Sequence, residues 1–455
     1  ATDTQGSKST AVGFQALTLQ NFTSATDSHN TAVGYNTGLA VTTGANNTLI
    51  GALAGDAMTT ASKNTTVGYN TGTGITTGGD NTFVGADVGV NVTTGNANIL
   101  IGGSESGAIG GTGEALTTGA RNTAIGSGAL KANTTASFNT AVGYGAGGGN
   151  ITGVEMVAVG FEALLSSTQT GQTAVGYKAG RLSTGDDNTF MGTFAGAAAT
   201  SGDKNTLIGA FSGTKITTSD ENTCIGNIAG FDLTTGADNT LVGSEAGQNV
   251  TTGASNSFLG KGAGDNTTSG GNQTLLGVGS NASAADGDHQ IVISTAAVTG
   301  AGNYTARLGT STGTVYIALD NSTTSWSKSS DERLKENIET STAGLSFIND
   351  LRPVTFDWKK KRDIPEDMKF NYSHVADDAP CVGNGKKVHG FIAQEVEAVI
   401  ANHPEVVEGN SITDIDAQGV HSLADGAMMP MMVKAVQELS TALDAALARI
   451  ATLEG

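Results

Sequence analysis

Apolar residues recur at a fixed spacing over the first 280 or so residues, and a glycine follows each of them. The phrase Asn-Thr-x-(Val/Ile/Leu)-Gly returns about every 17 residues, with longer intervals before Gly34 and before Gly126. A second phrase, Thr-Thr-Gly, follows most copies about ten residues later, as at Thr77-Gly78. Such repetition indicates a stack of short units that bury their apolar face against one another. We expect two short strands and two tight turns in each repeat.

Two apolar columns run through these repeats. The residue before each anchor glycine is apolar and of medium size, as in Val33, Ile50 and Leu276, and we assign this column to the inside of a β-solenoid. Successive strand residues point to opposite faces, so the alternate apolar column, with Ala32 and Leu49, faces outward. An outward apolar column needs a covering partner, and this predicts an oligomeric shaft.

A third column consists of asparagines, for example Asn30, Asn47 and Asn64. We interpret it as a ladder of side-chain amides between stacked rungs, although a glycan-binding role for some exposed members is the alternative. The repeat resembles the head repeats of trimeric bacterial adhesins, which form left-handed β-rolls, and repeats of phage tail fibres. That resemblance covers most of residues 9–280 and implies a trimeric β-roll.

Composition excludes several classes of protein. The 66 glycines among 455 residues lack the three-residue period of collagen, and the 14% of charged residues is too low for a disordered chain. A net charge of -19 argues against nucleic acid as a partner. No apolar run reaches the ~18 residues of a membrane span, and we expect no membrane insertion. The spacing of Cys224 and Cys381 suggests no metal site, and we expect no metal and no cofactor.

We predict no glycosidase activity in the shaft. A glycoside hydrolase needs two carboxylates at a fixed separation, usually with aromatic platforms for the sugar. Acidic residues such as Asp56, Asp203 and Glu245 are scattered through turns instead. The longer rung 103–120 and the irregular stretch 145–157 are the best places for a binding loop.

The chain changes character after the repeats. Residues 290–293, 304–308 and 314–318 read as strands, and all five prolines lie beyond residue 350. We therefore divide the chain into a repetitive β-solenoid shaft (1–289), a β-rich neck (290–328) and a small α+β domain (329–455). The predicted fold is mainly β overall.

Three motifs in the last part carry a specific resemblance. They are SDERLKENI at 330–338, LRPVTFDW at 351–358 and HGFIAQEV at 389–396. In this order they resemble the intramolecular chaperone auto-processing domain at the C-terminus of phage tailspikes and tail fibres, endosialidase tailspikes included. In that family the domain trimerises, templates folding of the shaft and then cuts itself off.

The resemblance implies a single-turnover serine endopeptidase with a Ser-Lys dyad. Ser330 would be the nucleophile, Lys335 its basic partner, and the bond between Ser329 and Ser330 the cleavage site. A serine hydroxyl can attack the preceding carbonyl if a neutral amine takes its proton. Desolvation or nearby positive charge, for example from Arg333, would lower the pKa of the lysine.

A structural interpretation of the same residues stays open. Ser329-x-x-Glu332 is also a capping box, and on an unbroken helix Ser330 and Lys335 would point about 140° apart. Either Ser330 precedes the helix or the lysine comes from another subunit. His389 and Gln394 are possible supporting residues of the site, and a purely structural role for each is the alternative.

The C-terminus predicts a coiled coil over 428–455. Apolar residues there alternate in steps of four and three: Met432, Val436, Leu439, Leu443, Ala446, Ile450 and Leu453. Three helices meeting along this seam would align the chains of a homotrimer before the shaft folds.

These observations lead to one functional hypothesis and two rivals. We expect a phage tail fibre or tailspike protein that is made in the host cytoplasm, is incorporated in the virion and attaches it to a host cell-surface receptor, either a glycan or an outer-surface protein. The alternatives are a non-viral trimeric surface adhesin and a structural fibre with an uncleaved trimerising cap.

Overall fold

The computed structural model describes residues 5–104, 110–311, 313–319, 332, 335–366, 368–369, 375–381, 387–406, 412–415 and 419–454. The predicted catalytic Ser330, its neighbour Ser329 and Arg333 lie outside these ranges. The chain divides into two compact units, Ala1–Ser329 and Ser330–Gly455. We call the second one the C-terminal unit.

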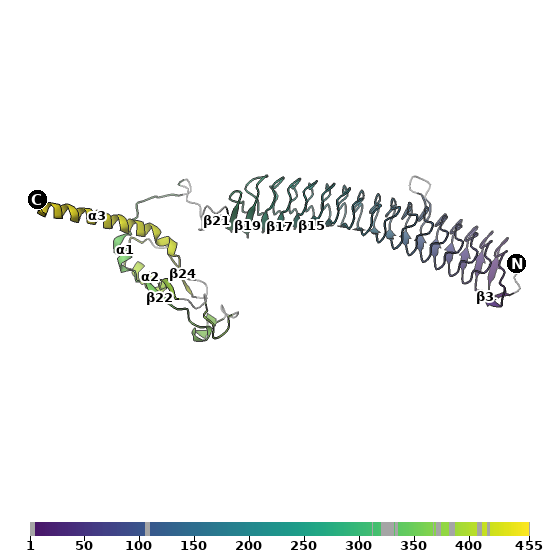
Figure 1. The fold of residues 1–455 in the computed structure, drawn as a ribbon, viewed down its shortest axis with the longest axis horizontal. Helices are drawn as coiled ribbons and strands as arrows, with labels where there is room; N and C mark the ends of the chain where they lie inside the picture. Colours follow the sequence, from purple (N-terminus) through teal and green to yellow (C-terminus); the bar gives the residue numbers. More distant parts are fainter. Residues whose placement is uncertain are drawn as a thin grey trace. The chain divides into compact units, whose positions relative to one another are not determined.

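The first unit is a β-solenoid whose rungs stack along one axis (Figure 1). Its strands are β1 (Gly6–Ser7), β2 (Thr10–Val12), β3 (Thr26–Asp27), β4 (Thr31–Val33), β5 (Thr48–Ile50), β6 (Thr65–Val67), β7 (Thr82–Val84), β8 (Ile99–Ile101), β9 (Thr123–Ile125), β10 (Thr140–Val142), β11 (Val157–Val159), β12 (Thr173–Val175), β13 (Thr189–Met191), β14 (Thr206–Ile208), β15 (Thr223–Ile225), β16 (Thr240–Val242), β17 (Ser257–Leu259), β18 (Thr274–Leu276), β19 (Gln290–Ser294), β20 (Thr305–Gly309) and β21 (Thr314–Ala318).

Each rung pairs with the next in parallel and with equivalent residues opposite one another. Thr31 of β4 faces Thr48 of β5, and Ala32 faces Leu49. The rest of each rung is also bonded to its neighbour, for instance Gly38 N–H to the Ala54 carbonyl at 3.0 Å, but it follows turns rather than a second strand. The expected two strands per repeat are therefore one strand and a run of turns.

The two apolar columns are reversed relative to our prediction. The middle residue of each strand from β4 to β18 is buried, with Ala32 and Phe83 at 0% exposure, whereas Val33 is 37% and Leu276 39% exposed. Our assignment of the column before the glycine to the inside is wrong. The reason is that threonine shares a strand face with that column, as Thr31 does with Val33, and leaving a hydroxyl in contact with water avoids the cost of burying it unpaired.

The asparagine ladder is confirmed. The backbone N–H and the side-chain amide of Asn47 both donate to Asn30 Oδ1, at 2.9 and 3.2 Å, and Asn47 Nδ2 also donates to the Ala61 carbonyl. The pattern continues at later rungs and is interrupted where Met156 occupies the column. The ladder satisfies polar groups that the solenoid buries completely.

Strands expected to form a separate neck continue the same sheet. β19 pairs in parallel with β18, and β20 pairs in parallel with β19. Only β21 reverses direction and runs antiparallel to β20. The shaft sheet therefore extends past residue 289 and ends in an antiparallel strand.

In its described residues, the C-terminal unit combines short strands with three α-helices. Its elements are α1 (Leu345–Asp350), β22 (Val354–Phe356), the 3-10 helix η2 (Lys361–Asp363), β23 (Val388–Gly390), α2 (Ala393–Ile400), β24 (Thr413–Ile415), β25 (His421–Leu423), the 3-10 helix η4 (Asp425–Met428) and α3 (Met429–Glu454). A small core gathers residues from distant segments, among them Phe347, Val396 and Met428. The predicted fold class, a mainly β solenoid followed by a small region that ends in a long helix, is confirmed.

Candidate functional site

Two of the three motifs meet in a small antiparallel sheet. β22 comes from the motif at 351–358 and β23 from the motif at 389–396, and Thr355 lies opposite His389. Arg352 and Glu395 join the same two motifs through a two-pronged ion pair, in which Arg352 Nε donates to Glu395 Oε2 at 2.9 Å and Nη2 donates to Oε1. These hydrogen bonds lower the pKa of the Glu395 carboxyl group. The motifs at 351–358 and 389–396 therefore form one structural element.

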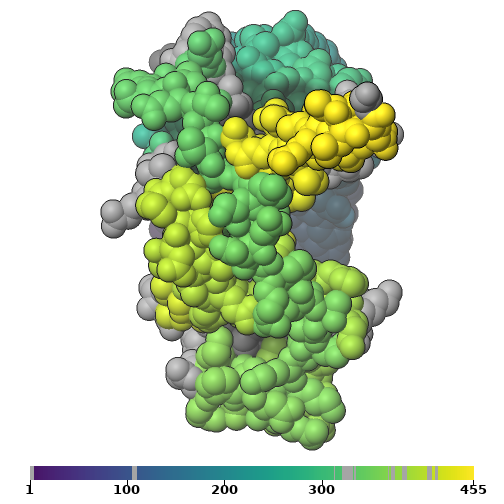
Figure 2. Space-filling view, turned by 90° about the vertical axis from the view of Figure 1, so that its left-hand side faces the viewer, coloured from purple at the N-terminus to yellow at the C-terminus, as the bar shows by residue number. Residues whose placement is uncertain are grey.

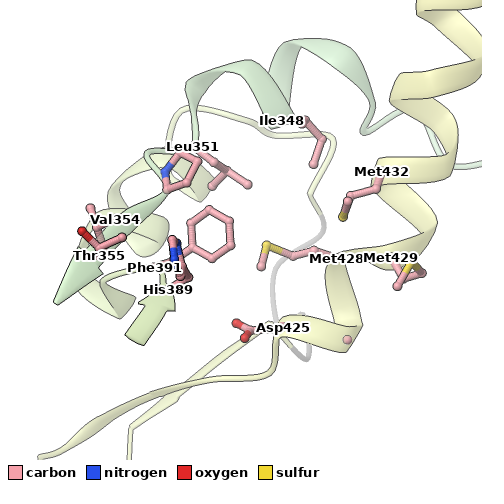
Figure 3. A pocket seen from close by; sticks show the side chains of 13 residues that line it. Ile348, Leu351, Val354, Thr355, His389, Phe391, Asp425, Met428, Met429 and Met432 are labelled. Atoms are coloured by element: carbon pink, nitrogen blue, oxygen red, sulfur yellow. The ribbon is translucent and has the colours of Figure 1, made fainter. Parts of the chain in front are cut away.

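His389 lies between two cavities. One, of about 780 Å³, has a mainly apolar wall. Its lining residues are Ile348, Leu351, Pro353, Val354, Thr355, His389, Gly390, Phe391, Asp425, Gly426, Met428, Met429 and Met432. Figure 3 shows the Phe391 ring and the Met428 side chain facing each other across it, with Asp425 at one edge. Sequence reasoning missed these methionines as pocket residues, because we assigned the segment 428–455, in which they lie, only to a coiled coil.

The other cavity, of about 830 Å³, brings together the two predicted supporting residues. His389 and Gln394 both line it, and both side chains are exposed. Trp358, Cys381 and His421 lie in the same wall. An imidazole and a carboxamide that face a cavity can donate and accept hydrogen bonds to a peptide chain placed there.

Lys335, the predicted base, is exposed, and its backbone N–H donates to the Glu332 carbonyl at 3.0 Å. It is not among the residues that line either cavity. Because Ser330 and Arg333 lie outside the described residues, the proposed dyad stays a prediction. The structure brings His389 and Gln394 together but shows no shared wall between them and Lys335.

A histidine clamp that the sequence did not reveal holds the helices of this unit. His403 is only 6% exposed, and its ring nitrogens lie 2.7 Å from Glu405 Oε1 and 2.8 Å from Asp350 Oδ2. Its ring also packs edge-on against Phe347. The Glu405 and then the Asp350 hydrogen bonds raise the pKa of His403, since both stabilise the imidazolium.

The apolar seam predicted at the C-terminus lies on α3 and faces outward. Val436 is 66%, Leu443 58% and Ile450 49% exposed. The space-filling view shows α3, in yellow, at the surface (Figure 2). Near its start α3 is fixed to α1, because Glu438 Oε2 accepts the Leu345 N–H at 2.8 Å. Such a seam is typical of helices that associate, and a coiled coil of three copies stays a prediction.

Two features are absent from the part of the chain that the structure describes. No cluster of three or more His, Cys, Asp or Glu residues is arranged to hold a metal ion there. No helix in those ranges combines the length and the apolar composition that crossing a membrane requires.

Comparison with known proteins gives one match. The family model described as chaperone of endosialidase, a peptidase family, matches residues 330–406. No curated protein and no solved structure matches the chain. The matched residues include both strands of the β22–β23 sheet, the Arg352–Glu395 pair and the cavity residues His389 and Gln394. The chain thus joins a β-solenoid to a C-terminal segment similar to the endosialidase chaperone, whose family implies self-cleaving peptidase activity.

Proposed function

We propose that this chain is a phage tail-fibre or tailspike protein of the virion. Its shaft would attach to a host-cell receptor, and its C-terminal unit would drive trimerisation and folding and then cleave itself off between Ser329 and Ser330. The observation that carries this proposal is the family match. It begins at Ser330, the residue at which the chain divides into its two compact units.

The proposed reaction is an acyl shift followed by hydrolysis. Ser330 Oγ attacks the Ser329 carbonyl carbon, and Lys335 Nζ, as a neutral amine, takes the hydroxyl proton. The C–N bond then breaks, the Ser330 nitrogen receives the proton, and Ser329 is held as an ester on Ser330. Water hydrolyses this ester. The products are a shaft that ends in the Ser329 carboxylate and a released unit that begins with the Ser330 amine.

Trimerisation supplies a reason for the timing of the cut. Lys335 is exposed in the single chain, and it could act as a base only as a neutral amine. Covering it with a neighbouring subunit would remove water, which favours the neutral form of an amine, and the positive charge of Arg333 would act in the same direction. Cleavage would then follow assembly, once the shaft has been aligned.

The α3 seam supports association of three chains. Large apolar side chains that are 49–80% exposed continue along the helix from Met432 to Leu453. Between α1 and α3 the seam borders an apolar hollow of about 180 Å³, lined by Leu345, Ile348, Met432, Ala435, Val436 and Leu439. Burial of apolar surface on this scale is the main driving force for subunit association.

The test is the intact mass of freshly expressed protein under denaturing conditions. We expect two fragments, 1–329 and 330–455, from the parent chain, and one uncut chain from Ser330→Ala and from Lys335→Ala. Lys335→Arg is the matched control for charge, since arginine keeps the positive charge but does not release its proton. It should remain uncut.

Two further variants separate chemistry from folding. Ser330→Cys keeps a nucleophile and should cut through a thioester that hydroxylamine intercepts. His389→Gln keeps a hydrogen-bonding side chain at the cavity wall and should slow cleavage rather than abolish it. An uncut parent chain that still forms trimers would leave a structural fibre with a trimerising cap, and the peptidase proposal would be wrong.

A further inference from the structure

The outward apolar column forms an unbroken strip along the shaft. We call it the outer strip, and define it as the residue before the anchor glycine of each rung together with its equivalents in β19 and β20. Its most exposed members are Val12, Val33, Ile50, Ile125, Met191, Ile225, Leu259, Leu276, Ile293 and Leu308, at 36–56% exposure. Each of the remaining rungs also places a valine or isoleucine there, as at Val67 and Ile208. A solvated surface would not need an apolar residue at every rung.

The neighbouring column behaves differently. The position just after each anchor glycine holds a tyrosine or phenylalanine in some rungs, as in Tyr144 and Phe161, but Ser127, Ser244 and Lys261 in others. Where aromatic residues occupy successive rungs their rings stack on one another, with centroids 5.2 Å apart for Tyr144 and Phe161. A position that accepts lysine stays in contact with water. Of these two outward-facing columns, only the outer strip is therefore apolar at every rung.

At the end of the shaft the outer strip borders a hollow of about 770 Å³. Leu276, Ile293 and Leu308 line it, and Val315 of the antiparallel β21 completes the apolar wall. All four side chains are 38–42% exposed. The strip thus remains apolar through the last parallel rungs and broadens where the sheet reverses.

We infer that the outer strip is the surface along which copies of this chain pack, parallel and in register. The occupant must present apolar side chains along the whole shaft at the spacing of one rung, because no rung leaves a gap in the strip. Another copy of the same shaft has this spacing, because its sequence is identical. Chains joined at their C-terminal helices would run in the same direction, so residues of the same number would meet. This inference rests on the proposed homotrimer and deepens it, since it assigns the shaft contact.

Disulfide trapping tests both the surface and the register. In full-length chains that carry Cys381→Ser, the variants Ile50→Cys and Leu276→Cys each place one thiol near one end of the outer strip. The remaining native cysteine, Cys224, is a silent background, because burial raises the pKa of its thiol to about 12 and leaves none of its surface exposed. Thr252→Cys is the matched control, an exposed residue on a Thr-Thr-Gly turn away from the strip.

We expect Ile50→Cys and Leu276→Cys each to form linked pairs on a non-reducing gel after mild oxidation, and Thr252→Cys to form few. Linkage only when both cysteines are present in one chain would indicate antiparallel packing and overturn the proposed register. An oligomer by native mass with no linkage at either position would overturn the outer strip while the homotrimer stands. Equal linkage at all three positions would overturn it as well. Self-cleavage is read from reduced lanes of the same gel, where its failure leaves an uncut chain. Failure of the outer strip instead appears as missing linkage in the non-reducing lanes.

Discussion

The shaft and the C-terminal unit hold themselves together over different distances along the sequence. In the shaft, a residue contacts its equivalent one rung away, as Thr31 contacts Thr48. In the C-terminal unit, Leu345 bonds to Glu438 and Asp350 to His403, pairs 93 and 53 residues apart. The stability of the shaft is thus a sum of many similar contacts between neighbouring rungs. The stability of the C-terminal unit depends instead on a few different contacts that form cooperatively.

This difference bears on folding. The strands β4, β5 and β6 are so alike that displacement by one rung would still pair threonine with threonine at the first position and apolar with apolar at the third. Nothing in the repeat alone selects one alignment of several chains. The C-terminal unit has unlike elements with one way to pair, and alignment that begins there would set the register of the shaft.

The largest effect should come from Phe347→Ala in the C-terminal unit. Phe347 is fully buried among residues from α1, α2 and η4 and packs against His403. Removing such a ring from a core costs about 3 to 5 kcal/mol. Because this core is shared, we expect hydrogen exchange to accelerate through the whole unit and self-cleavage to fail with it. The exposed Ile415→Ala is the control and should change neither. Acceleration limited to α1 would contradict the cooperative picture.

A smaller and more local effect is expected from Gly68→Ala in the shaft. Gly68 has a φ of +143°, and a Cβ there would lie 2.0 Å from the Gly85 carbonyl oxygen of the next rung. We expect a loss of about 3 kcal/mol, from backbone strain and the displaced rung. Faster hydrogen exchange should be confined to the rungs on either side, because each rung contacts only its neighbours.

Gly262→Ala is the matched control for the glycine substitution. Its φ of +61° is also positive, but a Cβ there meets nothing within 4 Å. Only the left-handed backbone penalty of about 1 to 2 kcal/mol applies. If the two variants were equally destabilised, close rung stacking would not be the reason for the glycine column.

The sequence predicted the shaft more fully than the C-terminal site. Its period, its glycines and the amide ladder of Asn30 and Asn47 follow from repetition, which reports each position many times over. Alternation showed that Ala32 and Val33 face opposite ways but did not say which faces in, and we chose wrongly. Thr31, which lies on the same strand face as Val33, was the available signal that this face is in contact with water. In hindsight, the inner column was a second signal. Its residues vary from alanine to phenylalanine between neighbouring rungs, as at Ala174 and Phe190, because these rungs share one core.

The C-terminal site could be predicted only through its resemblance to a family. The contacts that shape it, such as Arg352 with Glu395, join residues far apart in a stretch without repeats. Periodicity says nothing about such pairs. Exposed Lys335 illustrates the remaining gap, because its proposed role as a base would depend on which surface covers it in the proposed trimer.

The smallest predicted effect is the pH dependence of the histidine clamp. Glu405 and Asp350 raise the pKa of His403, so their contribution is fully present below the unfolded pKa of about 6.5 and is lost as pH rises through the folded value. His403 in turn lowers the pKa of Glu405, and that contribution is present above the unfolded pKa of about 4.3 and is lost as pH falls through the folded value. The clamp should therefore stabilise the C-terminal unit most between about pH 4.3 and 6.5.

His403→Gln should flatten this maximum in the free energy of unfolding, measured by denaturant titration at several pH values. In an imidazole NMR titration Glu405→Gln should lower the pKa of His403 more than Asp350→Asn does, because Glu405 makes the larger contribution. The histidine pair among the described ion pairs of the shaft, His289 with Asp288, is exposed, at 44% and 38%, so the same pH range should change the stability of the shaft less. A parallel pH response of both units would mean that overall charge, rather than this clamp, governs the stability of the C-terminal unit.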